Sequence, residues 1–216
     1  MRTLNVGRSV LALGLFMTIS GCGSSGVPLD RMAFEQSHNI GYFVHRVYPY
    51  HFWSGGTGTI GMWTDMGTEL VTGQSQEVEQ RMWQSGVYNV FEKRFASAFA
   101  EKLGSRFHPL DRSNLRYSDR KGKKVDIVGS AEAQGFDLVV EVSVRPVIYG
   151  ARRDNVTRYE SVVEVDLSAT RISDRKTVWK TSVHSSSEVT SYPGYRTLDK
   201  LAEGAAEQLV SFLEAH

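Results

Sequence analysis

Residues 137–149, which read Asp-Leu-Val-Val-Glu-Val-Ser-Val-Arg-Pro-Val-Ile-Tyr, decide the fold. From position 140 to position 144 every second residue is valine, and glutamate, serine and arginine alternate with these valines. A period of two, with one apolar and one polar side, is typical of a strand in an antiparallel sheet that is buried on one face only. The stretch therefore predicts a half-exposed strand.

Two further segments repeat this alternation, residues 158–172 and residues 177–189. Between them lies Ser173-Asp174-Arg175-Lys176, a polar tetrapeptide that predicts a tight turn. Three successive strands of this kind predict a β-meander in the C-terminal half of the chain. Three carboxylates fall on its polar side, and cross-strand pairing with basic side chains is a simpler role for them than a glycosidase pair. They are Glu141, Glu164 and Asp166.

The region before the meander predicts one strand and a long helical stretch. Residues 39–53 are rich in β-branched and aromatic side chains and predict a strand, which Pro49 ends or places at a sheet edge. Residues 76–103 carry apolar side chains at spacings of three and four, which predicts helix. Ser85-Gly86 is a candidate break between two helices.

Three shorter predictions complete the order of elements. Arg106–Pro109 predicts a short strand, and Val125–Ala133 predicts a short helix. An amphipathic helix is expected from about Leu198, with Thr197 as its N-cap. The order is β-α-β-α-β-β-β-α. We expect an α/β domain of the α+β type, with a mostly antiparallel sheet of four to five strands and helices packed on one face.

Composition restricts the function classes. The chain has 216 residues, with 25 Lys and Arg against 24 Asp and Glu, and a formal net charge of +1. A dedicated nucleic-acid binder would carry a basic excess, so no nucleic-acid partner is expected. There is one cysteine, so the sequence predicts neither an intramolecular disulfide nor a metal site built from cysteines.

The first 22 residues predict export and lipidation. Arg2 and Arg8 flank an apolar run over residues 10–19, which has the length of a signal-peptide core and is too short to span a bilayer. The run ends in Ile19-Ser20-Gly21-Cys22, the lipobox pattern, in which the cysteine thiol takes a diacylglyceryl group. An ordinary cleaved signal with an accidental cysteine is the alternative interpretation.

Lipidation of Cys22 predicts the location of the mature protein. We expect a signal peptide over 1–21, a lipidated cysteine and tether over 22–38, and a single periplasmic α/β domain over 39–216. Two or more acyl chains, a diacylglycerol and an N-acyl chain such as palmitate, give stable anchoring where one chain does not. Because Gly23 rather than Asp follows the cysteine, lipoprotein sorting implies the outer membrane, with the domain facing the periplasm.

Two motif matches are weak, and a histidine metal-binding motif is absent from the sequence. Residues 56–61 fit G-x-G-x-x-G, but the residues after them do not begin a convincing helix, so a loop is the simpler interpretation. The Ser-Asp-Arg-Lys tetrapeptides at 118–121 and 173–176 fit S-x-x-K, but the sequence lacks the S-D-N and K-T-G elements that accompany it. The six histidines include no H-x-x-x-H or H-E-x-x-H pair. The sequence therefore predicts no enzyme, no metal and no cofactor apart from the acyl chains on Cys22.

A cluster of aromatic residues is the best candidate for a functional surface. It lies in the first predicted strand and continues into residues 54–75, which are rich in Gly and Thr and predict a long loop. Most of these aromatic side chains are expected in the core. The remainder suit a contact with a protein, a glycan or a membrane, because amphipathic aromatic rings are favoured at interfaces. The candidate partner-binding residues are Tyr48, Tyr50, Phe52, Trp53 and Trp63.

Two stretches carry a family resemblance. Val128–Val142, in which Gly135-Phe136-Asp137 precedes an apolar strand, resembles a step from helix to strand in envelope lipoproteins. Asp174–Lys180, which reads Asp-Arg-Lys-Thr-Val-Trp-Lys, resembles their hairpin. With the closing helix, residues 85–215 resemble the periplasmic α/β domain shared by LpoB, the curli secretion lipoprotein CsgG and the N-terminal domain of TolB. The resemblance implies a non-enzymatic role and transfers no catalytic residue.

The expected function is that of an accessory or assembly factor in a cell-envelope complex for secretion, a surface appendage or the cell wall. Its partners are the membrane, through the lipid anchor, and an envelope protein or further copies of the chain. A lipoprotein that binds lipid, glycan or peptidoglycan is the alternative. A hydrolase is a third class, and it requires His184 or His108 beside two carboxylates in a cleft.

Overall fold

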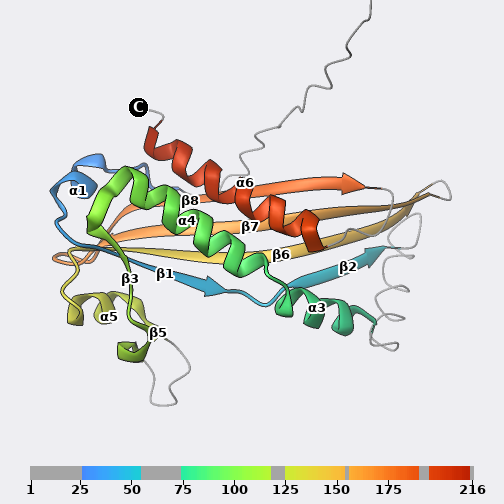
Figure 1. Cartoon of the computed structure of the whole chain (residues 1–216), viewed down its shortest axis with the longest axis horizontal. Helices are drawn as coiled ribbons and strands as arrows, with labels where there is room; N and C mark the ends of the chain where they lie inside the picture. The colour runs from blue at the N-terminus through green and yellow to red at the C-terminus, as the bar shows by residue number, and fades with distance from the viewer. Residues whose placement is uncertain (1–25, 55–73, 118–124, 154–155, 190–194, 215–216) are drawn as a thin grey trace, which may run out of the picture.

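A six-stranded mixed sheet forms the centre of the α+β structure (Figure 1). The computed structural model describes residues 26–54, 74–117, 125–153, 156–189 and 195–214. The strands lie in the order β3-β1-β6-β7-β8, and β2 pairs with β6 beyond the end of β1. Their bounds are β1 Ile40–Arg46, β2 Tyr50–Ser54, β3 Phe107–Pro109, β6 Leu138–Arg153, β7 Val156–Arg171 and β8 Lys176–Val189.

The predicted meander is confirmed. β6, β7 and β8 form antiparallel pairs, and the ladder between β6 and β7 runs from Leu138 opposite Arg171 to Arg153 opposite Val156. The tight turn between β7 and β8 holds Arg175 at a φ of 55°, and Arg171 donates to both carboxylate oxygens of Asp174 within it. On the polar side of the sheet, Arg145 and Glu164 form the expected cross-strand ion pair at 3.6 Å.

The sequence-based prediction of one strand over 39–53 and a mostly antiparallel sheet is wrong. The segment forms two strands, β1 and β2, and both run parallel to β6. β3 is also parallel to β1, so the sheet is mixed. The prediction failed because alternation identifies a strand and its faces but not the direction of its neighbour.

Two prolines coincide with the break between β1 and β2. Pro49 lies just before β2. Val47 N–H donates to the carbonyl of Val144, so the backbone groups of Val144, and those of Pro146 two residues later, point toward this break. Proline has no N–H group to donate. Pro146 therefore stands in a central strand at the place where the neighbouring ladder is interrupted.

Two long helices, α4 (Val87–Leu103) and α6 (Tyr195–Glu214), cover one face of the sheet (Figure 1). The apolar side of the meander packs beneath them, together with an aromatic row on α4. The row consists of Tyr88, Phe91, Phe95 and Phe99. The predicted break is confirmed, because one helix ends at Gln84 and the next begins at Val87. The helices are α1 Arg31–Gln36, α3 Gln74–Gln84, α4 Val87–Leu103, α5 Ile127–Ala133 and α6 Tyr195–Glu214.

The expectation that helices pack on one face only is also wrong. Phe43 and Val139 alternate along their strands with residues of the main core, so they point to the opposite face. There they form a second, smaller core with Ile127 and Ala131 of α5. A two-stranded sheet of β4 (Arg116–Tyr117) and β5 (Val125–Asp126) precedes α5. Farther along β6, this face carries Tyr149 and the ion pair of Arg145 and Glu164.

The N-terminal part of the domain includes a helix that the sequence pattern did not reveal. Val27 bridges to Lys180 on β8, and Asp30 accepts from Ala33 N–H as the N-cap of α1. Phe34 of α1 is buried and its ring lies 6.1 Å from that of Trp179. Among the described residues, Val27 and α1 therefore already pack against the sheet.

The predicted N-cap of the last helix is also corrected. α6 begins at Tyr195, so Thr197 lies in its first turn. The apolar periodicity marks the buried stripe, which starts at Leu198, and the helix itself begins earlier.

Phe95→Ala is expected to lower the free energy of unfolding by about 3–5 kcal/mol. Phe95 is fully buried, and its ring contacts those of Tyr42, Phe99 and Phe107 at 5.8, 4.3 and 5.8 Å. Urea denaturation followed by circular dichroism measures the change. The matched control is Tyr117→Ala, at an exposed aromatic residue. Equal losses in the two variants would contradict this description of the core.

Candidate functional site

Four exposed aromatic side chains lie in two pairs around β2 and the connection from β1 to β2. Tyr48 is 53% exposed, Tyr50 46%, Trp83 40% and Tyr149 37%. The rings of Tyr48 and Trp83 lie 5.7 Å apart. Tyr50 stands opposite Val147, and Tyr149 follows two residues later on the same face of β6. We call these four residues the aromatic patch.

The patch rests on a buried tyrosine. The ring of Trp83 lies 5.4 Å from that of Tyr88, which is 1% exposed. The Tyr88 hydroxyl donates to the carbonyl of Val47 at 2.7 Å, in the connection between β1 and β2. Burial raises the pKa of this hydroxyl above its usual value. The bond fixes the connection that carries Tyr48.

The edge of β2 is covered by a helix. α3 lies beside β2 (Figure 1), and the backbone N–H of His51 donates to the Glu79 carboxylate at 3.3 Å. A helix that covers a strand edge prevents unspecific pairing with other strands. The backbone of β2, α3 and β6 is therefore held in place before a partner binds. This reduces the conformational entropy that is lost on binding.

Charged side chains lie beside Tyr149. Glu160 lies opposite Tyr149 in the β6–β7 ladder, and the pair of Arg145 and Glu164 lies on the same face. Burial, followed by the negative charges of Glu164 and Glu160, raises the pKa of the Tyr149 hydroxyl. Apolar rings bordered by charged pairs are the usual composition of a protein–protein contact.

Of the residues that the sequence put forward, Tyr48 and Tyr50 are exposed in the structure. Phe52 and Trp53 belong to β2, and the structure describes only the backbone of these two residues. Trp63 and Cys22 lie outside the described residues, as do residues 56–61 and 118–121.

Sequence reasoning missed Trp83 and Tyr149. Tyr149 occupies an odd position in β6, the parity of Glu141 and Arg145, which would have placed it on the polar face. No comparable signal marks Trp83, because its exposure depends on how α3 sits against β2.

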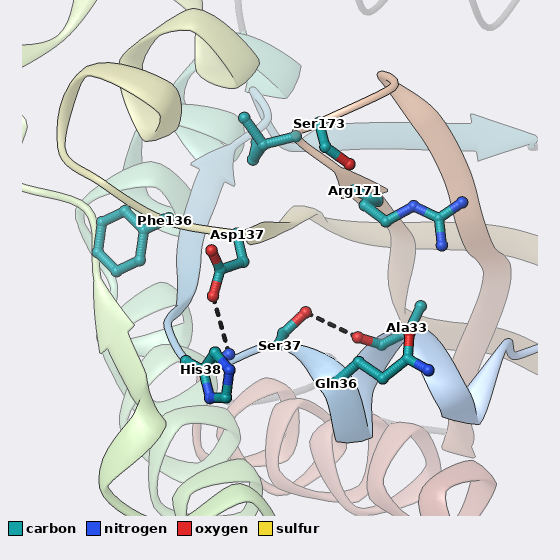
Figure 2. Close-up of a pocket in the computed structure, with 9 residues that line it drawn as sticks. Ala33, Gln36, Ser37, His38, Phe136, Asp137, Arg171 and Ser173 are labelled. Atoms are coloured by element: carbon teal, nitrogen blue, oxygen red, sulfur yellow. Dashed lines mark hydrogen bonds between the residues drawn. The ribbon is translucent and has the colours of Figure 1, made fainter.

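A second feature lies at the other end of the sheet, an open pocket of about 340 Å³ (Figure 2). Two of its charged side chains, Asp137 and Arg171, are bonded within the fold. The Asp137 carboxylate accepts from the backbone N–H groups of His38 and Asn39 at 2.8 and 3.0 Å. The guanidinium of Arg171 is bonded to Asp174 and holds the pKa of that carboxyl at about 2. The Asp137 bonds thus join the segment after α1 to the start of β6, and the Arg171 bond lies within the β7–β8 turn.

Neither a metal cluster nor a membrane-spanning helix occurs in the described part of the chain. Its His, Cys, Asp and Glu side chains form no group of three or more that suits a metal ion. Among the helices that the structure describes, none combines the length and apolar character needed to cross a membrane.

Tyr88→Phe is expected to lower the free energy of unfolding by about 1 kcal/mol, because it removes the donor to the Val47 carbonyl while keeping the ring. Urea denaturation checks the value. Tyr117→Phe, which changes an exposed hydroxyl, is the control and should leave stability unchanged. No loss in Tyr88→Phe would show that the bond does not fix the connection.

The solved structures that resemble this chain have low sequence identity to it. No protein-family model matches the chain, and no curated sequence does. Solved structures that resemble it include the PelC dodecamer from Paraburkholderia phytofirmans, 13% identical over 87% of this chain and 94% of that one, with a TM-score of 0.42. Lipoprotein GNA1162 from Neisseria meningitidis is 9% identical over 80% of this chain and 99% of that one, with a TM-score of 0.33.

The C-terminal domain of LpoB from Salmonella enterica is a third, 10% identical over 68% of this chain and 82% of that one, with a TM-score of 0.20. The solved structures that resemble this chain thus include bacterial lipoproteins. At these identities and scores the likeness does not indicate a binding partner or an activity for this chain.

Proposed function

We propose that the chain is a lipoprotein anchored in the outer membrane through Cys22, and that it is a non-enzymatic accessory or assembly factor of a cell-envelope complex. In this proposal the domain faces the periplasm, and the aromatic patch binds an envelope protein or another copy of the chain.

The anchor rests on the sequence Ile19-Ser20-Gly21-Cys22 after an apolar run. The thioether-linked diacylglycerol and the N-acyl chain together give membrane binding that one chain does not give. Gly23 after the cysteine favours the outer membrane.

The aromatic patch is the observation that carries the binding role. Its side chains are between 37% and 53% exposed, although tyrosine and tryptophan bury large areas when they find a partner. These residue types dominate the binding energy of protein interfaces. They come from β2, α3, β6 and the β1–β2 connection, so they spread over a surface that suits a protein better than a small ligand.

Crosslinking in cells tests the proposal. A C-terminally tagged chain is crosslinked, extracted from membranes, captured and identified by mass spectrometry. The wild type should give a discrete partner or a ladder of homo-oligomers. The double variant Tyr50→Ala/Tyr149→Ala should lose these products at normal abundance, because it removes two exposed rings of the patch without touching the core.

The matched control is Tyr117→Ala, which removes a similarly exposed ring on β4. It should crosslink like the wild type. Unchanged products in the double variant would contradict a role for the patch. Co-purification of peptidoglycan fragments or lipid, with no protein partner, would instead favour the alternative of a ligand-binding lipoprotein.

A further inference from the structure

The contact of Val27 with β8 limits how far a lipidated Cys22 can lie from the domain. Val27 N–H donates to the Lys180 carbonyl at 3.1 Å, and Lys180 N–H donates back to Val27 at 2.9 Å, at the outer edge of β8. From Cys22 to Val27 the chain can span at most about 18 Å. Acyl chains on Cys22 would therefore hold the surroundings of Val27 close to the lipid headgroups.

The domain is much longer than this reach. β6 has 16 residues, which corresponds to roughly 50 Å. A bilayer that holds Cys22 consequently meets the domain at one end of the sheet. Figure 1 shows α1 and the C-terminal end of α6 toward that end, and α3 with β2 toward the other.

Exposed apolar side chains lie at this end. Met32 of α1 is 64% exposed and Phe212 of α6 is 42% exposed. Both helices pack around Trp179, whose ring lies 6.1 Å from that of Phe34 and 6.3 Å from that of Phe212. The Arg31 guanidinium donates to the Leu213 carbonyl at 3.0 Å and joins the two helices directly. Met32 and Phe212 thus belong to one packed unit beside Val27.

We propose that this unit is the membrane-facing surface of the domain, with Met32 and Phe212 entering the boundary between headgroups and acyl chains. The inference rests on the proposed lipidation of Cys22.

This orientation leaves the aromatic patch away from the bilayer. Lys180 lies opposite Ser168, and Ser168 lies opposite Glu141 in the next ladder. From Glu141 to Tyr149 the strand rises by about 26 Å. A periplasmic partner can therefore reach the patch while the anchor is in the membrane.

A site-specific fluorescent probe tests the orientation. The full-length, lipidated chain is reconstituted in vesicles of phosphatidylethanolamine and phosphatidylglycerol, as Met32→Cys, Phe212→Cys or the control Gln84→Cys. Each is labelled with a thiol-reactive nitrobenzoxadiazole dye. Gln84 is exposed at the end of α3 and far from the unit. Circular dichroism verifies that each variant is folded.

At positions 32 and 212 we expect emission shifted to shorter wavelength in vesicles and quenching by lipids brominated near the headgroup, and no change at position 84. Identical, solvent-like emission at all three positions would overturn the proposed orientation. It would not contradict the lipidation of Cys22.

The labelling ratio separates the two proposals. A thioether on Cys22 does not react with the dye, so a lipidated variant takes one label per chain. Two labels per chain would show a free Cys22 thiol, and both the anchor and the orientation would then be wrong.

Discussion

The pairing of β6 on both of its edges is the constraint on which the rest of the structure depends. β7 follows it from Leu138 to Arg153, while β1 and β2 share its other edge. Because the side-chain period of a strand is two, this single register decides which residues face α4 and α6 and which face solvent or α5. Pro146 is tolerated in such a strand because the ladder toward β1 and β2 is interrupted beside it.

The same register separates two surfaces along one sheet. Near its start, α1 and the end of α6 pack around Trp179, next to the point where Val27 joins β8. Near its far end, Tyr50 and Tyr149 share a face, and Tyr48 is held by the connection that Tyr88 bonds. The first described contact thus lies toward one end of the sheet and the exposed aromatic rings toward the other, an arrangement that agrees with the proposed function.

Much of the fold could be predicted because alternation and helical periodicity are properties of the chain itself. The meander and the division at Ser85-Gly86 belong to this class. The short helix α1 could not be predicted, since its stability comes from tertiary contacts such as Phe34 with Trp179. Parallel pairing of β1 and the exposure of Trp83 likewise depend on neighbours that are distant in sequence. The candidate site was therefore predicted only in its local part, Tyr48 and Tyr50.

The mass of the N-terminal peptide tests the central claim, which is that this domain is held to a membrane through Cys22. Protein extracted from membranes by detergent is digested with trypsin, which cleaves after Arg31. A lipoprotein yields a peptide that begins at Cys22 and carries the added mass of a diacylglyceryl group and an N-acyl chain. An unmodified Cys22 thiol, or a peptide that continues into the residues before it, would contradict the claim.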